Sequence, residues 1–421
     1  MFPMRFSPNL NRRDIHLLLT HLPLSIILNV RMDKGNFQLA VRNSRSTQSG
    51  SQFSRRDFLK LTALGLGGLS LSPYLHASPA RAALGIPEFP KADLLGRVAQ
   101  GIAEVKSRPD LDSQTVATLY EDTVFPWLSE VPGEKPAYVF NNQKWVKMPD
   151  GYIYGPLIQP VHNRPNQPVS SLQKTSLGPG MWVEVTVPYV DVALQNDPSS
   201  HSWVEARTEE GRPIRLYYGQ VFWVDTIKKN KDGQVIYRVN PNFYGGVDMM
   251  WAAAEAFRPI HEDDLIPIHP EVLDKRVVVD VTYQTLVCLE GDQEVYFCRV
   301  STGAKYNASG EVVDNWSTPI GEHTISRKFI SLQMSGGTTG AGYDLPGIGW
   351  VTIFANGGVA LHSTVWHNNF GDAMSHGCVN MLPEDAKWVF RWSLPNVPYD
   401  PGMVDATLTG QASTKVEVIE G

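Results

Sequence analysis

The chain has 421 residues, of which 42% are hydrophobic and 19% charged, so it is long enough for two or three domains with ordinary soluble cores. Residues 1–82 carry 11 Lys/Arg and 3 Asp/Glu, which leaves the rest of the chain strongly acidic. An acidic body excludes nucleic acid as the expected partner, because such binding depends on neutralising phosphates. Thirty-five glycines and thirty prolines favour a mostly β protein with many turns.

An export signal is expected within residues 1–82. Residues 54–60, SRRDFLK, place paired arginines before a moderately apolar, glycine-containing run and a small-residue segment that suits cleavage after Ala82. This pattern resembles the twin-arginine (Tat) signal, and a buried glycine-rich helix is the alternative. Residues 1–31 fit the pattern poorly and are short for a membrane span, so we expect the chain to start at Met32. No stable membrane span is expected in the mature chain.

The next two segments differ in their periodicity. Residues 83–135 are expected to form a short helical region, because apolar residues between 94 and 105 recur at spacings of three and four. Residues 136–270 instead show short β runs broken by Pro, Gly and Asn, with a hairpin turn expected at 230–233. This second segment resembles the small SH3-like barrels coupled to cell-wall enzymes, and a β module of unknown role is the equal alternative.

A further domain is expected over residues 272–406, followed by a tail at 407–421. It opens with KRVVVDVTYQTLVCLEGDQEVYFCRVSTG, which indicates strands joined by a Gly-Asp turn. The glycine-rich stretch 334–349 is interpreted as a lid over a cleft.

The three cysteines do not indicate a disulfide. Cys288 and Cys298 flank the Gly-Asp turn, and a two-residue turn would pair Cys298 with Thr285 rather than with Cys288. Both are therefore expected to be buried apolar side chains. Cys378 differs, because it lies among histidines in LHSTVWHNNFGDAMSHGCVNM, and an exposed thiol outside the cytoplasm is a liability unless it is used.

Three interpretations of this stretch compete. Zinc sites usually draw on paired ligands, and the adjacent His376 and Cys378 are too cramped to aim at one ion, so no metal is expected. A polar loop without chemistry is the second interpretation. The third is a nucleophile with its base: an Asn-Gly hairpin turn places His362 at a strand end, and Pro383 begins a helix soon after Cys378. A thiol with an ordinary pKa of about 8.5 needs such a base or a positive environment to react as a thiolate.

The pattern H-x12-S-H-G-C-x-N is similar to the signature of the L,D-transpeptidase (YkuD-type) catalytic domain. The upstream segment STPIGEHTI resembles that family's Thr-Pro-x-Gly element at Thr318, Pro319 and Gly321. Papain-like and NlpC/P60-like peptidases instead place Cys before His. The resemblance covers roughly residues 272–400 and implies a YkuD-type β-sandwich preceded by the small barrel.

The resemblance also assigns roles. It implies that Cys378 is the nucleophile, that His362 is its base, and that the carbonyl of Ser363 orients the imidazole. It further implies that Ser375, His376 and Gly377 shape the pocket and the oxyanion hole, and that Asn380 occupies a family Arg/Asn position. Ser363 stands where many members have glycine. His367 has no family counterpart and is interpreted as loop surface.

The implied function is acyl transfer between peptidoglycan stem peptides, outside the cytoplasm and without a cofactor. A tetrapeptide stem would form a thioester with Cys378 and pass to an amine as a 3→3 cross-link. Resolution by water would make the protein a carboxypeptidase, and resolution by a protein amine would make it an anchoring enzyme. A non-catalytic wall-binding protein is the alternative from another class. The oligomeric state is not indicated.

Overall fold

The computed structural model describes residues 28–33, 36–41, 84–134, 142–196, 199–243, 248–305, 311–312, 316–336 and 343–421. The chain divides into two units, Met1–Ala80 and Arg81–Gly421. In the first unit β1 (Leu28–Asp33) pairs antiparallel with β2 (Asn36–Val41). The expected twin-arginine segment at 54–60 lies outside the described residues. Within the described part of the chain, no helix is long and apolar enough to cross a membrane.

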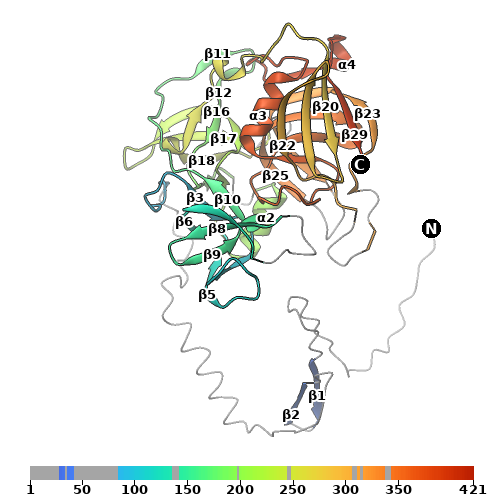
Figure 1. The fold of residues 1–421 in the computed structure, drawn as a ribbon. Helices are drawn as coiled ribbons and strands as arrows, with labels where there is room; N and C mark the ends of the chain where they lie inside the picture. The colour runs from blue at the N-terminus through green and yellow to red at the C-terminus, as the bar shows by residue number, and fades with distance from the viewer. Residues whose placement is uncertain are drawn as a thin grey trace, which may run out of the picture. The chain divides into compact units, whose positions relative to one another are not determined.

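The second unit begins with a small β module, which we call the first module (residues 84–161; Figure 1). Its strands form two sheets, ordered β10-β3-β6 and β5-β4-β9-β8-β7, around a core that includes Val105, Phe125 and Ile153. The strands are β3 (Leu95–Val98), β4 (Ile102–Lys106), β5 (Thr115–Tyr120), β6 (Val124–Pro126), β7 (Ser129–Pro132), β8 (Lys144–Met148), β9 (Gly151–Tyr154) and β10 (Ile158–Val161).

The helical region expected over 83–135 is wrong, because these residues are strands. Gly101 has a φ of +62° and turns the chain between β3 and β4. In β4 the side chains alternate: Ala103 is buried, whereas Ile102 is 61% exposed. The spacing of three and four therefore arose from two short strands separated by a turn. The boundary expected at 135/136 falls between β7 and β8, which pair in one sheet.

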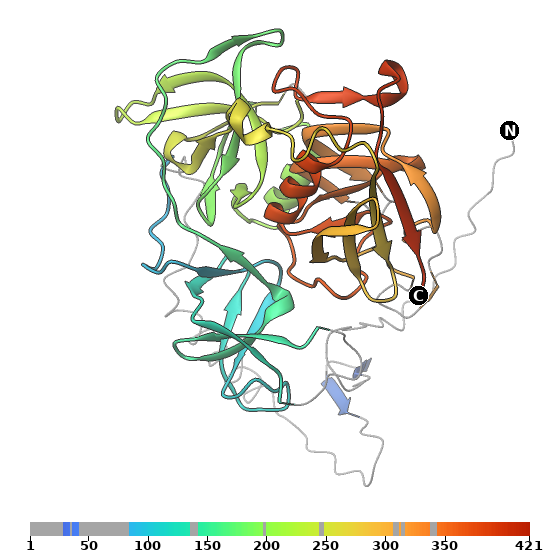
Figure 2. The same ribbon diagram turned by 45° about the horizontal axis from the view of Figure 1, so that its top comes forward.

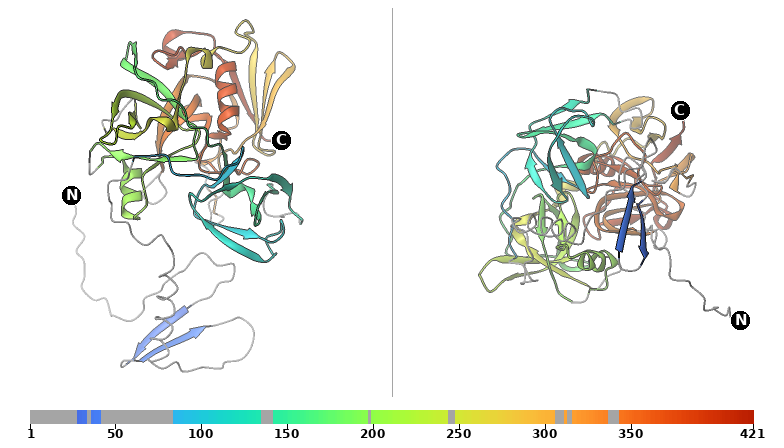
Figure 3. Two further views of the ribbon diagram at one scale, coloured as in Figure 1. Left: turned by 90° about the vertical axis from the view of Figure 1, so that its left-hand side faces the viewer. Right: turned by 90° about the horizontal axis from the view of Figure 1, so that it is seen from below.

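The second module follows and has its own core, which includes Val183, Phe222 and Tyr237. Its strands are separate from those of the first module in both views of Figure 3. The hairpin turn expected at 230–233 is confirmed between β16 and β17. The elements are β11 (Gln173–Thr175), β12 (Gly178–Val185), β13 (Tyr189–Asp191), β14 (Ala193–Leu194), α2 (Ser202–Glu209), β15 (Arg215–Tyr217), β16 (Val221–Lys229), β17 (Val235–Asn240), β18 (Met250–Ala253) and β19 (Phe257–Pro259).

The third part contains two five-stranded sheets, ordered β22-β21-β20-β29-β23 and β27-β26-β25-β24-β28. Helix α3 packs on β25 and β26, as Figure 2 shows. The elements are β20 (Lys275–Asp280), β21 (Thr285–Glu290), β22 (Gln293–Arg299), β23 (Gly321–Thr324), β24 (Arg327–Gly336), β25 (Tyr343–Ala355), β26 (Val359–Ser363), β27 (Val379–Met381), α3 (Pro383–Trp392), β28 (Met403–Asp405), α4 (Ala406–Thr409) and β29 (Lys415–Ile419).

The mostly β fold with a β-sandwich in its third part confirms the expected fold class. The tail expected at 407–421 is wrong, because β29 lies between β20 and β23 in the first sheet. Cys288 and Cys298 are buried free thiols, as expected. Their predicted register is wrong by one residue: Cys298 lies opposite Leu286, because a bulge follows Cys288.

Candidate functional site

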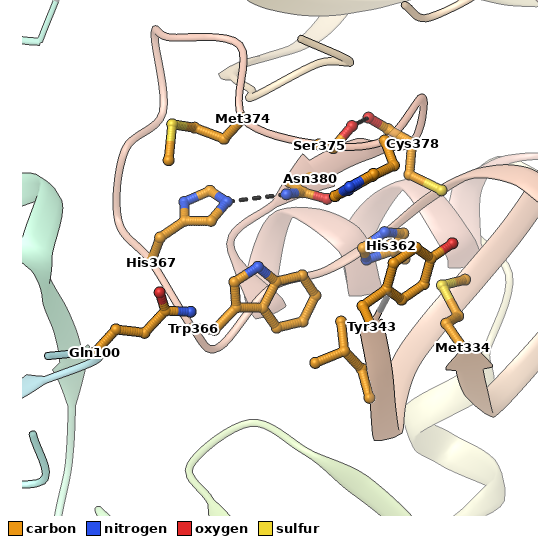
Figure 4. Close-up of a pocket in the computed structure, with 12 residues that line it drawn as sticks. Gln100, Met334, Tyr343, His362, Trp366, His367, Met374, Ser375, Cys378 and Asn380 are labelled. Carbon is orange, nitrogen blue, oxygen red and sulfur yellow. Dashed lines mark hydrogen bonds between the residues drawn. The ribbon is translucent and has the colours of Figure 1, made fainter. Parts of the chain in front are cut away.

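A pocket of about 290 Å³ is lined by side chains of β24 to β27 and of the segment between β26 and β27 (Figure 4). It contains the histidines and the cysteine that the sequence singled out. The lining residues are Gln100, Met334, Tyr343, Leu345, His362, Trp366, His367, Met374, Ser375, His376, Cys378 and Asn380. Met334, Tyr343 and Leu345 come from the stretch expected to be a lid, and here they are strand residues of β24 and β25. Residues 337–342 lie outside the described part of the chain.

His362 is the next-to-last residue of β26, the strand that the Asn-Gly turn predicted, and it is 2% exposed. Its Nδ1 lies 2.9 Å from the carbonyl oxygen of Ser363. Because a carbonyl can only accept, Nδ1 carries the proton and Nε2 is unprotonated. Burial lowers the pKa of His362 to about 4, against a smaller opposing effect of the Ser363 carbonyl. The imidazole is therefore neutral at physiological pH and has the tautomer of a base.

Cys378 is half-buried just before β27. Its Sγ lies 3.9 Å from the carbonyl oxygen of Gly358, a weak contact. Burial raises the pKa of the thiol to about 11, although the Ala360 N–H opposes this shift. Cys378 is therefore a neutral thiol and His362 a neutral imidazole at rest, and both side chains line the same pocket.

The turn before Cys378 is fixed by hydrogen bonds to its main chain. Thr318 Oγ1 donates to the Gly377 carbonyl (2.8 Å) and accepts from the Gly303 N–H (2.9 Å), so the Thr-Pro-x-Gly element lies against this turn. Gly377 has a φ of +118°, which favours glycine. Its N–H donates to Ser375 Oγ (3.1 Å), and this hydroxyl donates to the Cys378 carbonyl. The Gly377 N–H is thus engaged, and an oxyanion needs other donors.

His376 lines the pocket between two aromatic rings. Its ring centre lies 4.1 Å from that of Trp316 and 5.4 Å from that of Tyr343. Burial lowers its pKa, so the ring is held as a neutral wall of the pocket. Among the described residues there is no group of three or more His, Cys, Asp or Glu side chains placed to hold a metal ion.

The sequence suggested that His367 lies on the surface of a loop. This interpretation is wrong, because His367 is buried, with 8% of its surface exposed. One ring nitrogen lies 2.9 Å from the side-chain amide of Asn380, and the other accepts from the Asn369 N–H at 3.1 Å. Asn380 lies beside His362 in the parallel pair of β26 and β27, so both side chains share one face. One sequence signal points to His367, namely its position five residues after His362, in the loop that follows β26.

The loop between β26 and Cys378, residues 364–377, is held by the first module. Arg97 donates to the Val365 carbonyl at 2.8 Å, and the Asn368 N–H donates to the Pro156 carbonyl at 3.0 Å. Asn142 donates to the Phe370 carbonyl at 3.3 Å.

Arg97 itself is 1% exposed and forms an ion pair with Asp122 at 2.9 Å. Gln100 of the same module lines the pocket. The first module is therefore part of the wall of the site, which sequence periodicity could not indicate because it placed a helix there.

The part of the chain that contains the pocket matches a known protein family. Residues 274–418 match the family model described as the L,D-transpeptidase catalytic domain. This range contains the whole pocket except Gln100, and it includes β29 from the expected tail. No curated protein matches the chain.

Several solved structures are similar to the chain. An L,D-transpeptidase from Xylanimonas cellulosilytica is 20% identical over 35% of this chain and 60% of that one (TM-score 0.23). One from Stackebrandtia nassauensis is 22% identical over 38% of this chain and 61% of that one (TM-score 0.23). One from Mycobacterium smegmatis is 15% identical over 61% of this chain and 98% of that one (TM-score 0.26). The chain thus spans about 60% of the length of the first two.

Proposed function

Residues 274–418 of this chain form an L,D-transpeptidase catalytic domain, and we propose that the protein uses it to cross-link peptidoglycan stem peptides through a thioester on Cys378. The observation that carries the proposal is the tautomer of His362. Its Nδ1–H donates to the Ser363 carbonyl, so the unprotonated Nε2 can accept the thiol proton within the pocket that both side chains line.

The first step consumes a tetrapeptide stem. Cys378 Sγ attacks the carbonyl carbon of the third residue while its proton passes to His362. The tetrahedral intermediate then breaks its C–N bond, and His362 returns the proton to the departing amine of D-alanine.

In the second step an amine of a neighbouring stem attacks the thioester. A proton from this amine passes through His362 to the sulfur as the C–S bond breaks, which restores the free thiol. The product is a 3→3 cross-link. Water or a protein amine would resolve the same thioester to a shortened stem or an anchored protein.

The proposal is tested by incubating the purified chain with synthetic tetrapeptide stems and following the products by mass spectrometry. We expect loss of one alanine per stem, a thioester adduct on Cys378, and a dimer joined between two third residues. Products that contain only the shortened stem would assign the protein as a carboxypeptidase. Absence of both adduct and product would refute the proposal.

The pH dependence of the first step is expected to be nearly flat from about pH 5 to 9. His362 has to be neutral to accept a proton, and since its pKa is lowered to about 4, this ability is lost only as the pH falls through that value. The thiol, with its pKa raised to about 11, remains protonated until the attack. The rate of iodoacetamide alkylation of Cys378 should accordingly rise towards pH 11. An inflection near 8.5, the value of an ordinary thiol, would contradict this.

We propose that the protein acts outside the cytoplasm, after export through the twin-arginine pathway. Replacing Arg55-Arg56 with Lys-Lys should leave an uncleaved precursor inside the cell, because the arginine pair is what this pathway reads. A chain that starts at Met32 should be exported as well as the full chain and serves as the control. Immunoblotting of cell fractions distinguishes the precursor from the secreted protein. Normal secretion of the Lys-Lys variant would contradict the twin-arginine assignment.

A further inference from the structure

Of the described residues that line the pocket, Gln100 alone belongs to the first module. It lies in the turn between β3 and β4, next to Gly101. The main chain is held on both sides of it. The Ala99 N–H donates to the Leu157 carbonyl at 2.9 Å, and the Gly101 carbonyl accepts from the Glu121 N–H at 2.7 Å. The turn therefore presents the Gln100 side chain to the pocket from a fixed position.

The same turn is fastened to the loop that carries two other wall residues. Arg97, three residues before Gln100, donates at 2.8 Å to the carbonyl of the residue that precedes Trp366. Trp366 and His367 both line the pocket. In Figure 4 the Gln100 carboxamide points toward these two rings, at the end of the pocket away from Cys378. A peptide that extends from Cys378 along this wall meets Gln100 at a point remote from the bond that is cleaved.

The Gln100 carboxamide is available to a ligand. Its side chain is exposed, and within the described part of the chain it makes no hydrogen bond. The lining residues include no Asp, Glu, Lys or Arg, and burial keeps the three histidines of the wall neutral. An uncharged wall suits an uncharged group. A peptide bond offers one N–H and one C=O, and a carboxamide can pair with both.

Resting on the proposed function for its ligand, we propose that Gln100 is a specificity-determining residue whose carboxamide pairs with a main-chain amide of the stem peptide bound at Cys378. Gln100 Nε2 donates to the peptide carbonyl, and Oε1 accepts from the peptide N–H. Because the turn is held before the peptide arrives, only the side chain has to be ordered on binding. The first module thereby recognises a part of the stem that the catalytic pair does not touch.

Binding of a tetrapeptide stem to the full chain with Cys378→Ala tests this contact, because this background cannot consume the peptide. By isothermal titration calorimetry, we expect Gln100→Ala to raise Kd about tenfold, the effect of losing one or two hydrogen bonds. Gln100→Glu keeps the shape of the side chain but lacks the N–H donor, so it should bind as weakly. Gln114→Ala is the matched control, at an exposed position outside the pocket, and should leave Kd unchanged. Equal Kd values for Gln100→Ala and the control, or tighter binding by Gln100→Glu, would overturn the proposal.

A small probe separates a direct contact from a change in the shape of the pocket. The rate at which iodoacetamide alkylates Cys378 should be the same in Gln100→Ala and in the wild type, because this probe is too small to span the pocket. A rate altered more than about threefold, together with weaker peptide binding, would show that the substitution acts through the pocket wall and would overturn the proposal.

Turnover separates this proposal from the proposed function. In a chain with Cys378 intact, Gln100→Ala should lower kcat/KM for D-alanine release about tenfold, mainly through KM. Release of alanine with an unchanged KM would overturn the Gln100 contact and leave the proposed function standing. If no chain released alanine while binding still depended on Gln100, the proposed function would fail and the contact would stand.

Discussion

Replacing Cys378 with alanine is expected to abolish acyl transfer, with a fall in kcat/KM of at least about a thousandfold, because the covalent intermediate can no longer form. The fold should be retained, since the Cys378 sulfur makes only a weak contact with Gly358. Cys298→Ala is the matched control: this thiol is 6% exposed in the core and is not part of the pocket, so its loss should cost stability but not activity. Mass spectrometry of the stem peptides measures both variants.

Cys378→Ser sharpens the same test. A serine hydroxyl loses its proton far less readily than a thiol, and His362, with its pKa lowered to about 4, is a weak base. The serine variant should therefore bind the stem peptide but form no ester. Activity of either Cys378 variant within about tenfold of the wild type would sink the assignment of the nucleophile.

Replacing Lys328 with methionine is expected to destabilise the chain by about 3 kcal/mol, because three main-chain carbonyls lose their donor in a buried site. Lys328 is 0% exposed, and its Nζ donates to the carbonyls of Phe390 (2.6 Å), Ser393 (2.6 Å) and Pro395 (2.9 Å). Burial lowers the pKa of Lys328, whereas three acceptors require the three N–H groups of the ammonium form. The side chain thereby fixes the segment that ends α3.

Urea unfolding monitored by tryptophan fluorescence measures this effect. Lys415→Met, at an exposed position of β29, is the control and should change stability by less than about 0.5 kcal/mol. A midpoint for Lys328→Met equal to that of the control would show that water or a rearranged main chain replaces the lysine. A change in the slope rather than in the midpoint would indicate a change in the surface exposed on unfolding.

The parts of the molecule that the sequence predicted are those where local chemistry decides the structure. The Asn-Gly turn fixed β25 and β26 as a hairpin, and Pro383 with two acids after it fixed the start of α3. These two elements place His362 and Cys378 in one pocket, as predicted. Their catalytic roles remain predictions until the variants are measured.

The parts that the sequence missed depend on contacts between distant segments. Apolar residues between 94 and 105 satisfied a helical spacing, but the turn at Gly101 and the burial pattern of β4 belong to strands of the first module. His367 is buried against Asn380, which lies thirteen residues further along the chain. Strand β29 pairs with β20 and β23, which lie far from it in the sequence. Periodicity carries no information on such pairings, because they are set by tertiary packing.

The hydrogen bonds between the first module and the 364–377 loop limit which domains could replace the first module in a fusion protein. Arg97 and Asn142 both donate to main-chain carbonyls, so they hold the path of the loop whatever side chains it carries. Loop side chains can then be exchanged while the position of the wall is kept. A foreign domain fused in place of the first module would have to supply donors at the same two carbonyls. The module and the loop thus act as one structural piece, although more than two hundred residues separate them in the chain.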